Sequence, residues 1–225
     1  MRLYQLASQA LPIGGYSHSH GLEAAIDAGI VGDEATLTAW LEGLLRFPVG
    51  SYEAPLLVEL CAAWELPDAA RIAALNAEFL ATRETAELRA ATVQMGYSLR
   101  RLLAELPDIP PATLAALADL REPALPCAWA AATTAWTISA GESLQAYLWS
   151  WAENQVLVAI KTVPLGQSVG QRVLGRVAPL LAACAQAAVA AAPAGTPALP
   201  RSSYSPALAI LSARHETQYS RLFRS

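Results

Sequence analysis

Apolar residues recur along most of the chain at the three- and four-residue spacing of a buried helical face. The clearest stripe starts after the capping residue Asp33 and is expected to stop at Pro48 and Gly50. Similar patterns predict helices over 53–65, 68–80, 84–106, a short one ending at 120, then 126–140, 142–163 and a stripe from 169 to 184. No strand pattern is found, so the sequence predicts an all-α, single-domain helical bundle of about ten helices.

Composition divides the chain into three parts. Residues 1–192 form the expected helical core domain, and residues 193–206, rich in Pro, Ala and Ser, indicate a flexible linker. Residues 207–225 form a carboxyl-terminal tail that carries Tyr219, Leu222 and Phe223. A segment of this length is marginal as a free helix in water. The tail therefore needs a surface, supplied either by its own bundle or by a partner that its aromatic residues anchor.

Hydrophobic residues make up 54% of the chain and charged residues 15%, which leaves little charge to solvate a large free surface. We expect extra apolar surface to meet another subunit or partner. The net charge of −4 and the lack of a basic patch argue against nucleic acid. The start of the chain lacks the pattern of a signal peptide. The most apolar run, 177–192, contains Pro179 and Gln186 and is too short to cross a bilayer, so a cytoplasmic protein without membrane contact is expected.

Residues 11–23 read L-P-I-G-G-Y-S-H-S-H-G-L-E and predict a turn that leads into a helix. Pro12 and the Gly14-Gly15 pair favour the turn. Ser17 is the expected helix cap, which places His18 and His20 in the first helical turn.

The sequence holds few candidates for chemistry. It contains no glycine-rich phosphate loop, so it should not bind a nucleotide alone, and its carboxylates are scattered, so no catalytic residues are predicted. His18, His20 and Glu23, with His215-Glu216 in the tail, could form a transition-metal site. Residues two apart on one helix point in different directions, however, and we interpret the histidines as interface or capping residues, with no stable metal site.

Three other polar features stand out. Lys161 is the single lysine beside 14 arginines, which makes a position-specific role conceivable. Asn154 and Gln155 lie among apolar residues and should form a satisfied polar contact in the core or at an interface. The polar face of the helix over 84–106 is expected to be solvated and includes Arg83, Glu87, Arg100 and Arg101.

Cys61, Cys127 and Cys184 lack disulfide or zinc spacing and should be reduced thiols.

Four stretches together resemble the urease accessory protein F family (UreF), and they run in the family's order along the whole chain. They are LASQALPIGGYSHSHGLE (6–23), RETAELRAATVQMG (83–96), AIKTVPLGQ (159–167) and RHETQYSRLFRS (214–225).

The resemblance implies a non-enzymatic, dimeric all-α scaffold in urease maturation. Family members bridge the accessory protein D, also called H, and the GTPase G for nickel insertion into apo-urease, and are described as modulators of GTP hydrolysis. No cofactor is expected, because nickel passes through the complex and the partner binds GTP. The tail from Arg214 would dock the D protein, and Lys161 with the V-P-L-G-Q turn would face the GTPase.

The resemblance thus places partner contacts at fifteen positions. These are Pro12, Gly14, Tyr16, Ser17, Glu23, Lys161, Arg214, His215, Glu216, Tyr219, Arg221, Leu222, Phe223, Arg224 and Ser225. Two alternatives remain at this point. One is a nickel-binding metallochaperone or metal-dependent enzyme, with a transient nickel contact at His18 and His20 and with Glu23 and His215 nearby. The other is a generic helical adaptor.

Overall fold

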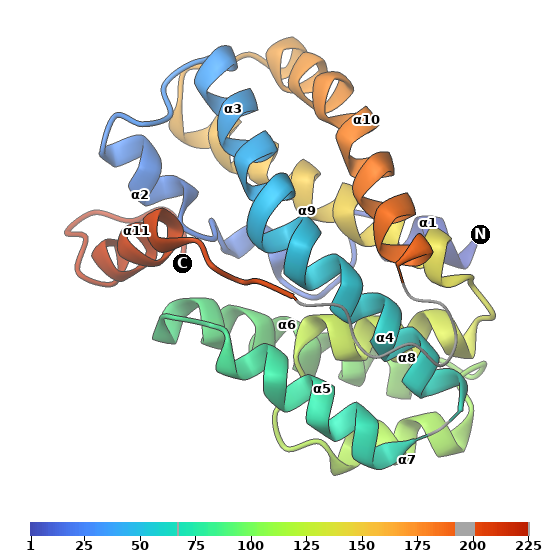
Figure 1. Cartoon of the computed structure of the whole chain (residues 1–225). Coiled ribbons are helices and arrows are strands. Elements are labelled where there is room, and N and C mark those ends of the chain that lie inside the picture. Colours follow the sequence, from blue (N-terminus) through green and yellow to red (C-terminus); the bar gives the residue numbers. More distant parts are fainter. Residues whose placement is uncertain (67, 192–200, 225) are drawn as a thin grey trace.

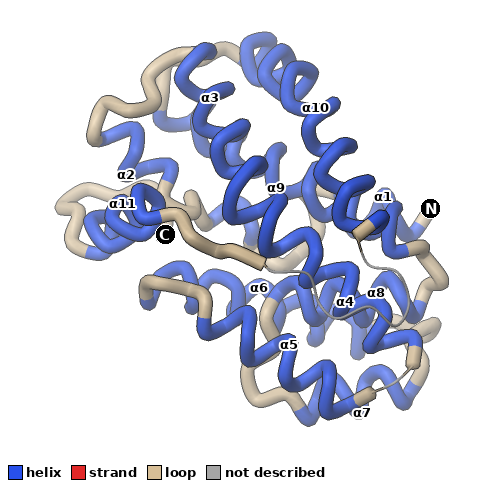
Figure 2. Tube along the Cα trace, in the orientation of Figure 1, coloured by secondary structure: helices blue, strands red, loops and turns tan. Residues whose placement is uncertain are grey.

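A computed structural model describes residues 1–66, 68–191 and 201–224. These residues form helices and loops without a strand, which confirms the predicted all-α, single-domain fold (Figure 2). The helices are α1 (Arg2–Ala7), η1 (Gly15–Ser17), α2 (Leu22–Asp27), α3 (Glu34–Leu44), η2 (Leu45–Glu53), α4 (Ala54–Glu65), α5 (Ala69–Ala81), α6 (Ala86–Glu105), α7 (Pro111–Asp119), α8 (Leu125–Ala135), α9 (Ala140–Thr162), α10 (Gln167–Ala190) and α11 (Pro206–Glu216).

Helix α9 lies in the middle of the bundle, as its apolar composition predicted (Figure 1). Helices α10, α3 and α4 pack against it, and α1 and α2 contact its other parts. Helices α5 to α8 form the lower half in Figure 1, where α8 packs between α4 and α6. The core includes the fully buried Trp129 of α8, whose ring meets Tyr147 of α9 edge to face at 5.4 Å.

Local capping explains why several helices begin where they do. Asp33 accepts a hydrogen bond from the backbone of Thr36, and Ser139 accepts one from Glu142, each within a reciprocal capping box. Thr85 caps α6 by accepting from Leu88 N at 3.2 Å. These short-range signals are present in the sequence, so the starts of these helices are its most predictable features.

The expected stop at Pro48 and Gly50 is wrong. Helix α3 continues through the π-helical segment η2 into α4, and Figure 1 shows the three as one long rod. A π-helix shifts the hydrogen-bond pattern by one residue, which lets the chain pass a proline that would break a regular α-helix. Gly50 allows close packing here, because a Cβ atom would overlap the carbonyl oxygen of Leu45 and meet Cys184 Sγ at 3.0 Å.

Two further bounds differ from the prediction. The expected helix over 126–140 ends at Ala135, because Thr137 adopts a left-handed backbone with φ of 53° before α9 begins. Helix α10 passes Pro179 and is 24 residues long, which is enough by length and composition to cross a membrane. It packs along α9 and α3, and its Arg172 pairs with Glu34 of α3 at 2.6 Å.

Residues 193–200 of the predicted linker lie outside the described residues. Residues 201–205 extend along the rod toward α11 (Figure 1), and Pro206 is the first residue of α11. Arg201 is bound by Glu59 of α4 and bidentately by Glu78 of α5, at 2.7 and 2.8 Å. Helix α11 then packs on α2 and α6, so the described tail lies on its own bundle. This is the first of the two arrangements considered from the sequence.

Candidate functional site

The segment that leads into α2 is a loop and not the helix expected from Ser17. Gly14, with φ of 76°, precedes the short 3₁₀ helix η1, and His20 and Gly21 have φ values of 52° and 82°. Two consecutive left-handed residues cannot lie within a right-handed α-helix. Gly21 is therefore the residue before α2, and the capping role assigned to Ser17 is wrong.

Side-chain amides from the central helix α9 hold this loop. Asn154 Nδ2 donates to the carbonyl of His18 and Gln155 Nε2 donates to that of Ser19, each at 3.0 Å. The prediction of a polar contact in the core is confirmed for the amide nitrogens of both residues, but Asn154 Oδ1 is buried without a partner among the described residues. The partners of the two amide nitrogens lie 136 positions earlier in the chain, so local sequence signals cannot reveal the loop that they support.

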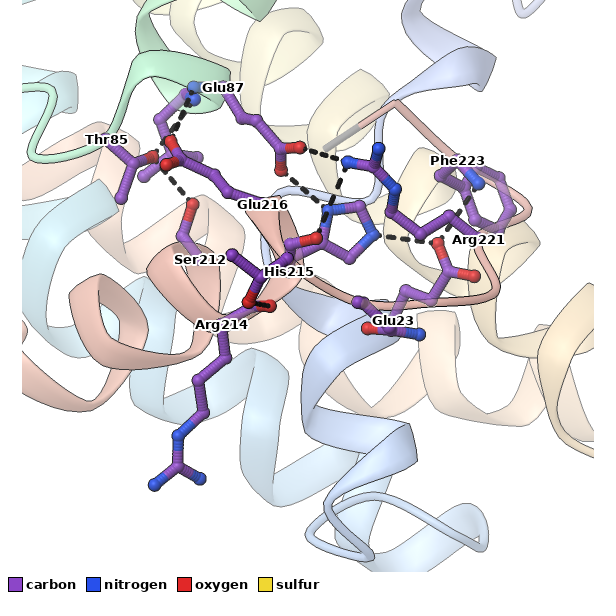
Figure 3. Close-up of polar contacts among 12 residues, drawn as sticks. Glu23, Thr85, Glu87, Ser212, Arg214, His215, Glu216, Arg221 and Phe223 are labelled. Carbon is purple, nitrogen blue, oxygen red and sulfur yellow. Dashed lines mark hydrogen bonds and ion pairs between the residues drawn. The ribbon is translucent and has the colours of Figure 1, made fainter.

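A largely buried polar cluster joins α2, α6, α11 and the tail after it (Figure 3). Nε2 of His215 lies 3.0 Å from a carboxylate oxygen of Glu23, and Nδ1 lies 2.6 Å from one of Glu87. The exposed fractions of these side chains are 0% for His215, 8% for Glu23 and 13% for Glu87. Arg221 binds the other oxygen of Glu87 at 2.6 Å.

Glu23 also holds the backbone of the tail. Leu222 N donates to one of its carboxylate oxygens at 2.7 Å, and Phe223 N donates to the other at 3.0 Å. One residue further on, Arg224 N donates to the carbonyl of Ser17 at 2.9 Å. The tail after α11 is thus fixed to the amino-terminal loop through main-chain groups as well as side chains.

The tail residues predicted to contact partners fall into two sets. His215 and Phe223 are buried and point into this body, so they can influence a partner only indirectly. The exposed set presents side chains to solvent and comprises Arg214, Glu216, Tyr219, Arg221, Leu222 and Arg224. Ser225 lies outside the described residues.

Lys161 brings the third stretch to the same place. It lies at the exposed end of α9, where its Nζ is 6.0 Å from the ring centre of Tyr16 and 5.8 Å from that of Phe223. These distances are at the limit of a cation–π contact. Gln94 of α6 completes the group, because its Oε1 accepts from Arg224 at 3.4 Å. Residues from all four stretches therefore meet, and we call the exposed side chains of Tyr16, Lys161, Tyr219, Leu222 and Arg224 the junction face.

The expectation that the polar face of α6 is solvated is wrong for three of its residues. Glu87 binds His215, and Arg83 pairs with the mostly buried Glu53 at 2.8 Å. Arg100 donates to the carbonyl of Leu120 at 2.9 Å. Glu53 and Glu87 are functional candidates that sequence reasoning missed. The available signal for Glu87 was its place within the stretch 83–96.

His18 and His20 lie near each other, with ring centres 6.2 Å apart, but on a loop and not on a helix. Burial, followed by the charges of His20 and Arg224, lowers the pKa of His18 to about 4. Burial and then the charge of Arg83 lower the pKa of His20 to about 4. Both are therefore neutral near pH 7. Among the described residues, no group of three or more His, Cys, Asp or Glu side chains is placed to hold a metal ion.

His20 faces a cavity of about 100 Å³ between the amino-terminal loop and α5, α6, α8 and α9. Its polar lining includes the Glu53–Arg83 pair, and Tyr147 donates to Glu53 at 3.2 Å. Two buried atoms beside this space, Asn154 Oδ1 and Arg83 Nε, have no hydrogen-bond partner among the described residues.

The three cysteines do not line this cavity, and they are free thiols, as predicted. Burial raises the pKa of Cys61 to about 11.

Comparison with known proteins adds the family context. A family model described as UreF matches residues 31–178. The urease accessory protein UreF of Azoarcus sp. strain BH72 is 51% identical over 227 residues, covering 100% of this chain and 95% of the relative. The protein of that name from Dechloromonas aromatica strain RCB is 50% identical over 228 residues, covering 100% and 96%. The bifunctional urease accessory protein UreEF of Bordetella bronchiseptica is 50% identical over 99% of this chain, which spans 51% of that protein.

Proposed function

The chain belongs to the UreF family of urease accessory proteins, and on that premise we propose that it is a non-enzymatic scaffold in urease maturation. It positions the accessory protein D, also called H, and the GTPase G for nickel insertion into apo-urease in the cytoplasm. Nickel is then cargo of the assembly, and GTP is bound and hydrolysed by the partner. The fused relative in Bordetella bronchiseptica supports a role beside other accessory proteins.

The junction face carries this proposal. It joins residues from stretches that lie at opposite ends of the chain, because Lys161 lies near Tyr16 and the tail residue Phe223, and the same tail exposes Tyr219 and Leu222. Exposed aromatic residues beside arginine are typical of the energetic centre of protein interfaces. We assign Tyr219 and Leu222 to the D protein, and Lys161 with the turn at 163–167 to the GTPase.

Binding of the D protein to point variants tests the first assignment. Removal of the whole tail would also remove His215 and Phe223 from the body, so Tyr219→Ala with Leu222→Ala is the sharper change. These side chains are exposed, and their loss should weaken binding at least about tenfold while thermal unfolding stays unchanged. Ile210→Ala, at an exposed position of α11 before the stretch, is the matched control. Equal binding by the double variant and the parent would exclude this docking site.

Lys161 provides the corresponding test for the GTPase. Lys161→Ala should weaken co-purification with the G protein, and Lys161→Arg should retain most of it, because arginine keeps the positive charge near the two rings. If both variants bind like the parent, the GTPase contacts another surface. The rate of GTP hydrolysis in the same complexes would show whether the scaffold also modulates the enzyme.

We also propose a homodimer, because a chain with 15% charged residues has little charge to solvate its whole surface. Light scattering during size exclusion should give twice the mass of one chain, both alone and within the complex with the D protein. A monomeric mass in both samples would contradict this part of the proposal.

A further inference from the structure

The buried His215 is held in a geometry that a doubly protonated ring satisfies when both neighbouring carboxylates are ionised. Each ring nitrogen faces a carboxylate oxygen at hydrogen-bond distance, Nδ1 toward Glu87 and Nε2 toward Glu23. A carboxylate only accepts hydrogen bonds, and a neutral imidazole has one N–H and one bare nitrogen. A neutral ring, which is fully buried here, would therefore place a lone pair against one carboxylate.

Charges around the ring lead to the same conclusion. Helix α2 contributes Glu23, α6 contributes Glu87, and the tail contributes Arg221, whose guanidinium binds Glu87. Helix α11 itself carries Glu216, which accepts from Glu87 N at 3.3 Å, and the exposed Arg214. The two buried carboxylates are balanced by Arg221 and a charged His215, whereas a neutral His215 would leave one buried negative charge without a counterpart.

We infer that a proton on His215 holds the carboxyl-terminal segment on the body. Loss of this proton releases residues 217–224 and separates the tail residues of the junction face from Tyr16 and Lys161. Release follows because the carboxylates that hold the ring also hold the tail: Glu23 accepts from the Leu222 and Phe223 main chain, and Glu87 binds Arg221. Docking of the tail is thus linked to the binding of one proton. The effect on partner binding rests on the proposed function. The attachment of the tail does not, because all of its contacts lie within this chain.

Nuclear magnetic resonance of the isolated full chain tests the protonation state directly. Ring ¹⁵N shifts of His215 should show two protonated nitrogens while the Leu222 and Phe223 amides are protected from exchange. As the pH rises, their protection factors should fall by up to about tenfold per pH unit, the slope expected for one linked proton. A neutral His215 ring in the docked state would overturn the inference.

Glu87→Gln separates a proton requirement from a merely structural one. In this variant a neutral ring can donate from Nε2 to Glu23 and accept at Nδ1 from the glutamine amide, and the glutamine Oε1 can still accept from Arg221. The tail should stay docked, with protection that no longer depends on pH. Glu216→Gln, which alters an exposed carboxylate on α11, should keep the slope of the parent. Identical slopes for the parent and Glu87→Gln would also overturn the inference.

The partners need not be present in these measurements, so their outcome is independent of the docking assignments. If the fastening is confirmed and the D protein still ignores Tyr219 and Leu222, the proposed function fails while the inference stands. If the D protein binds this face with an affinity that does not depend on pH, in the parent and in Glu87→Gln alike, the inference fails while the proposed function stands.

Discussion

Single buried side chains decide how the amino-terminal loop is held and how it responds to acid. His20 occupies a left-handed position beside the cavity, and Asn154 and Gln155 hold the carbonyls of the two residues before it. Sequence reasoning identified both amides and both histidines as notable. It could not foresee their geometry, because the hydrogen bonds that define the loop come from α9 and not from neighbouring residues.

The low pKa values of His18 and His20 predict loss of stability in acid. In the folded protein both lie near 4, whereas an exposed histidine titrates near 6.5. Between these pH values the unfolded chain binds more protons than the folded protein. The contribution of the two neutral histidines to the free energy of unfolding is therefore complete above about pH 6.5 and is lost as the pH falls to about 4. His20→Asn tolerates the left-handed backbone. It should flatten the decline in unfolding free energy by up to about 1.4 kcal/mol per pH unit.

Urea unfolding at a series of pH values measures this effect. Carboxylates titrate in the same range in both proteins, so the informative quantity is the difference between the parent and His20→Asn. If the free energies of unfolding of the parent and of His20→Asn change in parallel with pH, His20 does not take up a proton on unfolding.

Among the elements, the helix starts with a local side-chain cap can be read from the sequence, whereas the start of α2 and the helix connections could not be predicted. Asp33, Thr85 and Ser139 cap their helices through partners three residues away, which is a signal that the sequence displays. The passage of the rod through Pro48 depends on packing against α10, where Cys184 lies beside Gly50, and local propensity favoured a stop. Glu87 was placed on a solvated face because nothing near it in sequence shows that α11 covers it.

Gly96 sets the approach of α6 to the start of α8. A Cβ atom at this position would overlap the backbone of Pro123 and Ala124, which cannot move aside as a flexible side chain would. Gly96→Ala should therefore destabilise the protein by roughly 2 to 3 kcal/mol. Gly175→Ala in α10 is the control: among the described residues, no atom outside its own stretch of helix lies within 4 Å of the added Cβ, so it should stabilise by about 0.5 to 1 kcal/mol. Thermal unfolding of both variants gives the comparison, and equal shifts would contradict the packing role of Gly96.

Arg201 fastens the extended residues before α11 to the rod. Its side chain is 8% exposed and binds Glu59 and Glu78, and Arg71, at 47% exposure, shares Glu59. Arg201→Ala should cost roughly 2 kcal/mol, because it removes a mostly buried guanidinium and leaves Glu78 without a charged partner, while Glu59 keeps Arg71. Arg71→Ala should cost less than about 1 kcal/mol, as an exposed pair does. Denaturant unfolding of the two variants measures both values, and a smaller effect for Arg201→Ala would refute the fastening role.

At the scale of the whole molecule, the four stretches identified from sequence proved to be neighbours in space. Their resemblance to a family marked them as important, yet it could not show that the tail folds onto the loop, since His215 and Glu23 are 192 positions apart. Contacts of that separation leave no periodic pattern in a sequence. The fold class, by contrast, followed from periodicity alone.

The central cavity predicts ordered water inside the protein. Its volume of about 100 Å³ has room for several molecules, and Asn154 Oδ1 and Arg83 Nε supply unmet hydrogen-bonding capacity. A crystal structure at high resolution should show water bound to both atoms. Empty density beside these two atoms would contradict the prediction.

Docking of the tail on the amino-terminal loop also sets an order of events during synthesis. Glu23 leaves the ribosome almost two hundred residues before His215. At about 5 to 20 residues per second, that gap lasts on the order of ten to forty seconds. A nascent or prematurely terminated chain can bury most of its core in that time but has no junction face to offer. Assembly with partners that use this face therefore has to follow translation, which spares them from capturing incomplete chains.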